Sequence, residues 1–159
     1  MLLNSMKHIK FIQTLPISIN EAWDFFSSPK NLNEITPPDM TFVITSEILN
    51  KMYEGMFITY KVSPFFGIKL NWVTEITHIK DKEFFVDEQR VGPYRIWHHE
   101  HHFKVVPGGV EMTDILYYDI GKGLLGFTAG FAFVDDKVKQ IFDYRYRKLE
   151  EIFGSIKVN

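Results

Sequence analysis

One stretch decides the fold: residues 94–120 read YRIWHHEHHFKVVPGGVEMTDILYYDI. Two segments of strand-like composition flank the turn signal Pro107-Gly108-Gly109. Such a short connection is typical of antiparallel neighbours in a sheet. The stretch therefore predicts a β-hairpin, with one strand over Tyr94–Val106 and the other over Val110–Ile120.

Strand-like segments continue toward the N-terminus of the chain. Apolar and polar residues alternate near residues 8–15, which predicts a first strand. Short turns separate four further predicted strands, over Thr41–Leu49, Met56–Val62, Ile68–Ile79 and Glu83–Arg90. The pattern predicts an antiparallel meander of about seven strands.

Helical patterns occur after the first strand and at the C-terminal end. Ser18 and Glu21 have the spacing of a capping box, and Pro29 ends the short helix that follows. A second short helix is predicted over Lys30–Ile35. A long amphipathic helix is predicted from about Phe133 to Phe153, with an apolar stripe of Val134, Val138, Ile141, Phe142, Leu149, Ile152 and Phe153.

These elements predict an α+β fold. A strongly curved antiparallel sheet wrapped around the long C-terminal helix buries the apolar stripe of that helix. A sheet of so many strands curls, which leaves a cavity between sheet and helix. The aromatic content of 16% favours a large apolar lining for such a cavity.

The composition limits the partners and the chemistry of the chain. The 159 residues suggest a single domain over residues 1–159, with ordered pattern from about 7 to 153. The net charge of −2 gives no bulk attraction to nucleic acid or anionic lipid. The absence of cysteine excludes disulfides, zinc–thiolate sites and cysteine nucleophiles.

No apolar run reaches the ~18 residues that a membrane span needs. The N-terminal residues also lack the basic start of a secretory signal. We therefore expect a cytoplasmic protein without an integral membrane segment and without nucleic acid as a partner.

The histidines of the decisive stretch divide between two faces. On a strand, Trp97, His99, His101 and Phe103 share one face, whereas His98 and its alternates share the other. The first face combines large aromatic rings with groups that titrate near neutrality. We therefore predict that this face lines the cavity and that His98 and His102 are solvated.

The register predicted for the strand pairs places further residues on each face. A two-residue turn at Val91-Gly92 sets Glu88 opposite Arg95, as an ion pair, and Val86 opposite Trp97. A one-residue slip inverts this assignment for one strand.

A turn at Gly108-Gly109 sets Phe103 opposite Asp114, so that Asp114 lies diagonal to His101. A three-residue turn would bring Ile115 and Tyr117 inward instead. The first alternative is preferred, because Met112, Leu116 and Ile120 form a better buried row. Leu70, Trp72, Thr74 and Ile76 are expected on a neighbouring wall.

Three segments resemble a bacterial branch of the SRPBCC superfamily, which includes START, polyketide cyclase/dehydrase and Bet v 1-like proteins. Residues 25–38, FFSSPKNLNEITPP, are similar to its NL-x-x-ITPP segment. Residues 92–103, GPYRIWHHEHHF, are similar to its GP-x-x-x-W-x-H-x-H-x-F segment, and residues 113–118, TDILYY, to its T-D-x-v-x-Y stretch. The resemblance extends from about Lys7 to Phe153.

This resemblance implies the helix-grip fold, the architecture that the order of elements also predicts. It does not imply one activity, because the superfamily includes lipid carriers, hormone receptors, ubiquinone-binding proteins, aromatase/cyclases and oxygenase subunits.

The leading hypothesis is a binder of a small or medium hydrophobic molecule, such as a lipid, isoprenoid, quinone or polyketide-like compound, held between the sheet and the C-terminal helix. Phe127 lies in the glycine-rich segment Gly121–Gly130, a predicted flexible gate. The residues expected to contact the ligand are Trp72, Val86, Trp97, His99, His101, Phe103, Asp114, Leu116, Tyr118, Phe127, Phe142 and Arg145.

Two other classes of function stay open. In a cyclase/dehydratase-type enzyme, His99 or His101 is the acid/base and Asp114 orients it. In an interaction module, an exposed apolar patch near Phe65-Phe66 docks on a partner protein.

Interpretations of the histidines that involve no catalysis also stay open. They could be structural residues that bridge strands. As metal ligands, His99 and His101 would need a third ligand at fixed spacing besides Asp114, and the sequence offers none. No metal and no cofactor are therefore predicted.

Overall fold

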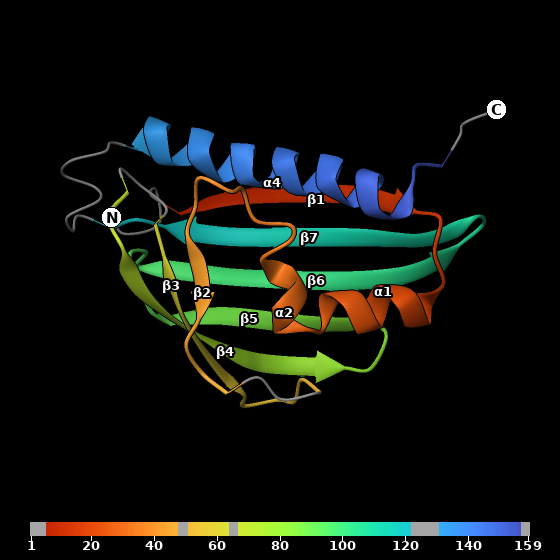
Figure 1. Cartoon of the computed structure of the whole chain (residues 1–159), viewed down its shortest axis with the longest axis horizontal. Helices are drawn as coiled ribbons and strands as arrows, with labels where there is room; N and C mark the ends of the chain where they lie inside the picture. The colour runs from red at the N-terminus through yellow and green to blue at the C-terminus, as the bar shows by residue number, and fades with distance from the viewer. Residues whose placement is uncertain (1–5, 48–50, 64–66, 122–130, 157–159) are drawn as a thin grey trace.

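The computed structural model describes residues 6–47, 51–63, 67–121 and 131–156. Seven strands form one antiparallel sheet with the order β1-β7-β6-β5-β4-β3-β2 (Figure 1). Their bounds are β1 Lys7–Leu15, β2 Phe42–Ile44, β3 Phe57–Val62, β4 Leu70–Lys80, β5 Phe84–Val91, β6 Ile96–Val106 and β7 Gly109–Asp119.

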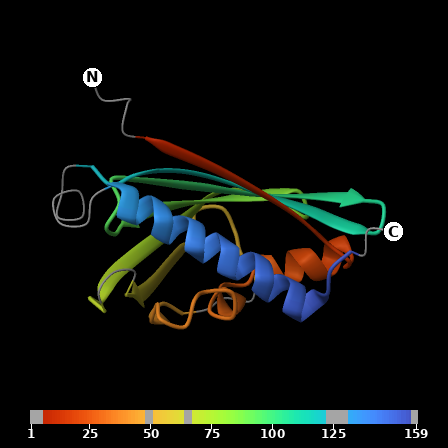
Figure 2. The same cartoon turned by 90° about the horizontal axis from the view of Figure 1, so that it is seen from above.

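The helices that the structure describes lie on one side of this sheet. The helices α1 (Ile19–Phe26) and α2 (Pro29–Leu32) follow β1, and the long helix α4 (Phe131–Phe153) follows β7. Figure 2 shows the sheet curving toward the side on which α4 crosses it. The predicted α+β helix-grip architecture is confirmed. Within the described ranges, no helix has the length and apolar character to span a membrane.

The capping box before α1 forms as predicted. The Ser18 hydroxyl accepts the Glu21 backbone N–H at 3.2 Å, and the Glu21 carboxylate accepts the Ser18 N–H at 2.9 Å. Two otherwise unpaired N–H groups at the helix start are thereby satisfied.

Two apolar clusters form the core. One lies beneath the first half of α4, where Val134, Val138 and Phe142 meet β3, β4 and β7. The other lies beneath α1, where Trp23 packs on Phe103. The stripe of α4 is largely confirmed, except that Ile152 near its C-terminal end is 37% exposed.

The predicted register between β5 and β6 is wrong. Glu88 lies opposite His98 and Asp87 lies opposite His99, a shift by an odd number of residues. The strand β5 runs on to Val91, which pairs with Val73 of β4, so the turn cannot begin at Val91. Instead, Gln89 closes the connection by hydrogen bonds to the N–H (3.2 Å) and carbonyl oxygen (2.5 Å) of Tyr94.

This shift has two consequences. Asp87 points to the same side of the sheet as His99, because directly paired residues share a face. The ion pair predicted between Glu88 and Arg95 does not form: Arg95 pairs with Asp119, and Glu88 pairs with Arg90 and His98.

The hairpin of β6 and β7 has the predicted faces with a register shifted by two residues. Asp114 lies directly opposite His101, and Met112 lies opposite Phe103. An even shift preserves the faces, so the buried row Met112, Leu116 and Ile120 is confirmed, although the turn lies at Pro107-Gly108 and not at Gly108-Gly109.

Some predicted features lie outside the described residues. They are the end of the strand predicted over Thr41–Leu49, the Phe65-Phe66 turn, and most of the glycine-rich segment with Phe127.

Candidate functional site

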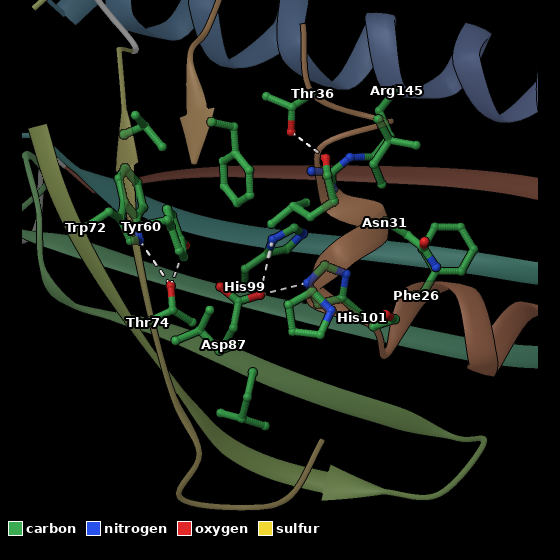
Figure 3. Close-up of a pocket in the computed structure, with 18 of the residues that line it drawn as sticks. Phe26, Asn31, Thr36, Tyr60, Trp72, Thr74, Asp87, His99, His101 and Arg145 are labelled. Atoms are coloured by element: carbon green, nitrogen blue, oxygen red, sulfur yellow. Dashed lines mark hydrogen bonds and ion pairs between the residues drawn. The ribbon is translucent and has the colours of Figure 1, made fainter. Parts of the chain in front are cut away.

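A pocket of about 170 Å³ lies between the curved sheet and the helices. Its walls come from α1 and α2, from β2 to β6 on the concave face of the sheet, and from Ile141 and Arg145 of α4 (Figure 3). A cavity needs about 10–15 Å³ of such volume to hold a single water molecule. The pocket is therefore much larger than a buried-water site.

Most of the wall is apolar. Aromatic rings of Phe26, Phe85, Trp72 and Trp97 and the side chain of Ile58 contribute to it. Such a surface favours an apolar guest, because contact removes apolar area from water.

The polar end of the pocket is a cluster of two histidines and two aspartates. His101 contacts Asp87 through Nε2 at 2.8 Å and Asp114 through Nδ1 at 2.9 Å. His99 contacts Asp114 through Nε2 at 3.1 Å and lies with Nδ1 3.6 Å from Asp87. The two imidazole rings are 3.8 Å apart between centroids. Each carboxylate thus faces both rings.

The strands explain why these four side chains meet. His99 and His101 are alternate residues of β6, and each has its Asp directly or diagonally opposite on β5 or β7. Asp87, His99 and His101 reach the pocket wall, whereas Asp114 lies behind them. The side chain of His99 is only 5% exposed.

Burial and hydrogen bonding move the pKa values of the two histidines in opposite directions. Burial, followed by the charge of His101, lowers the pKa of His99. Burial would also lower the pKa of His101, but hydrogen bonds to Asp114 and Asp87 outweigh it and raise that pKa. We therefore assign the imidazolium to His101 and the neutral ring to His99.

The aspartates remain ionised. Burial opposes ionisation of Asp87 and Asp114, yet the hydrogen bond from His101 and the positive charge nearby hold both carboxyl pKa values below the usual range. With two carboxylates and one imidazolium, the cluster has a net charge of −1.

With these protonation states, His99 Nδ1 and an Asp87 oxygen are two hydrogen-bond acceptors that face each other with no proton between them. The protonated His101 donates from both nitrogens, and neutral His99 donates from Nε2 to Asp114. The lone pair of His99 Nδ1 then faces the Asp87 oxygen across 3.6 Å. At the pocket wall, His99 Nδ1 can therefore accept a proton, or a hydrogen bond from a hydroxyl group of a ligand.

A second polar group lies on β3 and β4. The Tyr60 hydroxyl and Thr74 hydroxyl are hydrogen-bonded at 2.6 Å, and Trp72 Nε1 donates to Thr74 at 3.1 Å. Burial and the Asp87 charge raise the pKa of Tyr60. Tyr60 therefore presents a neutral hydroxyl to the pocket.

Arg145 approaches the pocket from the helix side. Its guanidinium carbon lies 5.1 Å from the centroid of the Phe142 ring. Figure 3 shows Arg145 pointing from α4 toward the side where His99, His101 and Asp87 lie. The pocket thus has donors from α4 and an acceptor-rich cluster from the sheet.

Three ligand atoms for a metal ion come together in this cluster. Asp87, His99 and His101 offer ligand atoms that lie within 4.8 Å of one another. Sequence reasoning considered Asp114 as the oxygen donor and lacked the third ligand that Asp87 supplies. Both nitrogens of His101 are engaged by carboxylates, so coordination would require loss of its proton and of one hydrogen bond.

The structure brings five of the predicted contact residues to the pocket: Trp72, Trp97, His99, His101 and Arg145. Of the predicted neighbouring wall, Trp72, Thr74 and Ile76 also lie there, whereas Leu70 does not line the pocket. Phe127 lies outside the described residues.

Six predicted contact residues lie elsewhere in the core. Val86 is buried away from the pocket, since the register shift puts its neighbours Phe85 and Asp87 on the pocket side. Phe103 packs against Trp23 under α1, Leu116 is fully buried, and Tyr118 donates to Asp135 of α4. Asp114 and Phe142 support pocket residues from behind.

Sequence reasoning missed Asp87, Tyr60 and the α2 side of the pocket. The predicted register, with Val86 opposite Trp97 on the inner face, puts Asp87 on the outer face by alternation; a one-residue slip of that register is the signal that would place it inward. Asn31 and Thr36 were quoted only for the resemblance, and the helix positions that bring them to the pocket follow from tertiary packing.

Comparisons with known proteins identify the fold. No protein-family model and no curated protein matches the chain. Among solved structures, CV1439 from Chromobacterium violaceum is similar with a TM-score of 0.72 and 10% identity, over 94% of this chain and 98% of that one. Ms6760 from Mycobacterium smegmatis has a TM-score of 0.66 and 15% identity, over 91% and 89% of the two chains.

Ara h 8.0201 is also similar, with a TM-score of 0.59 and 11% identity, over 92% of this chain and 99% of that one. At these identities the likeness concerns the fold alone. The chain has a Bet v 1-like helix-grip fold, and its chemistry has to be argued from its own residues.

Proposed function

We propose that this protein binds a small or medium hydrophobic molecule with a polar head, such as a lipid, isoprenoid, quinone or polyketide-like compound. The observation that carries the proposal is the pocket of about 170 Å³ with an apolar wall and one polar end. Ligand sites typically combine an apolar surface with a few placed polar groups that set orientation.

The two parts of the pocket divide the work of recognition. The aromatic and aliphatic wall supplies affinity at about 25 cal/mol per Å² of apolar surface removed from water, less the cost of ordering the ligand. Polar groups on both sides orient a polar head: the Arg145 guanidinium on α4, and the His99 and Asp87 acceptors with the Tyr60 hydroxyl on the sheet.

The test is recovery of a bound molecule. We expect native mass spectrometry of protein purified from its natural host, with extraction of the released compound, to find a co-purifying hydrophobic molecule. The variant Val62→Phe adds a ring at the pocket wall and should lose it. The matched control Val43→Phe makes the same change where the side chain is 51% exposed, and should retain it.

Recovery of no compound from wild-type protein, or equal recovery from both variants, would contradict the proposal. Circular dichroism checks that each variant folds.

An acid–base enzyme is the second candidate function, favoured by the neutral His99 at the pocket wall. Its Nδ1 has a free lone pair and its Nε2 is oriented by Asp114, as a general base requires. In this mechanism His99 takes a proton from a bound carbonyl compound, and His101 serves as the adjacent acid.

The variant His99→Gln separates the two functions. For an enzyme, we expect the co-purified compound to accumulate unreacted in this variant, whereas wild-type protein contains its product by mass spectrometry. Identical bound molecules in wild type and variant would dismiss the enzyme.

A further inference from the structure

Arg145 has an unusual environment for a cation at a pocket wall. The side chain packs over the Phe142 ring, which stacks on Phe11 of β1 with centroids 4.4 Å apart and an interplanar angle of 5°. Phe142 also meets the His99 ring edge-on at 5.5 Å. The guanidinium is therefore supported by a fixed aromatic surface.

One hydrogen-bond donor of this guanidinium has no acceptor within the described residues. Its Nε atom is buried and has no hydrogen-bond partner among them. A buried donor without an acceptor is destabilising and is uncommon in native structures.

Two other arginines show what a paired guanidinium looks like in this protein. Arg90 contacts Glu75 and Glu88, and Arg95 contacts Asp119. The positive charge of Arg145 helps to lower the pKa of Asp87, but Asp87 is already hydrogen-bonded to His101 at 2.8 Å. Arg145 lines the pocket, so a molecule bound there can supply the acceptor that its Nε lacks among the described residues.

Resting on the proposed function, we propose that the ligand is an amphiphile with a carboxylate head, which Arg145 binds through its Nε–H and a neighbouring N–H. The guanidinium fork matches the two oxygens of a carboxylate. The tail then lies along the apolar wall.

Charge favours a monoanion over a dianion. The His/Asp cluster has a net charge of −1, and Arg145 balances it. A carboxylate adds a single negative charge near Asp87, whereas a dianionic phosphate ester would meet about twice that repulsion.

The experiment compares two probes with the same number of carbons, octanoate and 1-octanol, at pH 7.5. Isothermal titration calorimetry measures both, and fluorescence of Trp72 and Trp97 at the pocket wall provides a second readout. We expect wild-type protein to bind octanoate about tenfold or more tightly than 1-octanol, because a charge-assisted pair is lost in the alcohol.

Three variants locate the preference. Arg145→Met should bind the two probes about equally, and Arg145→Lys should retain a reduced preference for the acid because it keeps charge without the fork. The matched control Arg147→Met removes an exposed arginine two residues along α4 and should keep the wild-type preference.

Each other outcome overturns the inference. Equal binding of both probes by wild type rejects the carboxylate head. An unchanged preference in Arg145→Met rejects Arg145 as its binding residue. Both outcomes leave the proposed function standing. Binding of neither probe also rejects the inference, while co-purification judges the proposed function separately. If Arg145→Met does not fold, the wild-type comparison and Arg145→Lys decide.

Discussion

At the residue scale, His99 and His101 differ because their partners differ. Both rings are buried between Asp87 and Asp114, but only His101 has short contacts from both nitrogens. One proton on His101 is thereby held in place, whereas His99 keeps a lone pair at the pocket wall. Two chemically identical side chains, two positions apart on a strand, thus have different protonation states.

The first prediction concerns the pH dependence of stability. Folding raises the pKa of His101 above its ordinary value of 6.5. Its contribution to stability is therefore complete below about pH 6.5 and is lost as the pH rises through the folded-state pKa. In urea denaturation, the stability advantage of wild type over His101→Gln should be largest at acidic pH and shrink toward pH 9.

The lowered pKa of His99 acts with the opposite sign, since its neutral form is favoured. Its contribution is present above pH 6.5 and is lost as the pH falls through its folded-state pKa. NMR titration of the imidazole protons should show His101 titrating above 6.5 and His99 below it. The reverse order would contradict the protonation states assigned to the pair.

The second prediction concerns Thr74, the shared partner of Tyr60 and Trp72. The change Thr74→Val keeps the shape of the side chain but removes the hydroxyl that is the hydrogen-bond partner of the buried Tyr60 hydroxyl and Trp72 Nε1. We expect a loss of about 1–3 kcal/mol in the free energy of unfolding, because buried groups lose their partner. Chemical denaturation measures it.

The matched control for this change is Thr45→Val. Thr45 is hydrogen-bonded to Thr59 at 2.8 Å, but at an exposed site where water replaces the lost partner. Its effect should stay within about 0.5 kcal/mol. An equally small effect at Thr74 would show that the buried network contributes little.

At the element scale, β1 pairs with β7 and forms one edge of the sheet. Leu15 pairs with Val110, directly beside the turn that joins β6 and β7. Gly109 lies at this point, and a Cβ there would overlap the backbone oxygen of Leu15. The close approach of two strand ends, rather than the turn itself, requires glycine at this position.

The third prediction follows from this contact. Gly109→Ala should lower the free energy of unfolding by about 2–4 kcal/mol, because the backbone of β1 has to move. Gly108→Ala tests the neighbouring turn residue, where a Cβ meets only Ile156 at 3.7 Å and φ is +89°. The free energy of unfolding of this control should fall by only about 1–2 kcal/mol, the cost of alanine in the left-handed conformation. Equal losses would indicate turn strain as the common cause.

At the scale of the whole molecule, the curvature of the sheet and the long helix enclose the pocket together. The wall residues come from eight elements, α1, α2, β2 to β6 and α4, so a guest in the pocket would contact both the sheet and these helices. Binding to the folded state alone stabilises it by mass action.

The fourth prediction applies this linkage. Octanoate at a hundred times its dissociation constant should raise the free energy of unfolding of wild type by about 2.7 kcal/mol. The Val62→Phe variant should show no increase, because its pocket is filled. Thermal denaturation with and without octanoate measures both, and stabilisation of the filled variant would indicate binding at another surface.

Much of the architecture was predictable because it depends on local patterns. Alternation along residues 97–103 assigned His99 and His101 to one face, and the spacing of Ser18 and Glu21 predicted the start of α1. These features need only the period of a strand or the geometry of one helical turn. The apolar stripe of α4 likewise predicted which side of the helix faces the sheet.

The composition of the site depended on contacts between distant segments. Asp87 faces the pocket because β5 extends to pair with β4 and Gln89 closes the following connection, which shifts the register by an odd number of residues. No local pattern within β5 distinguishes this register from its neighbour. The sequence by itself determined the order and faces of the elements, through short-range periodicity. Only the tertiary structure decided that Asp87 joins the histidines and that Arg145 Nε has no acceptor among the described residues, because both depend on how separate elements dock.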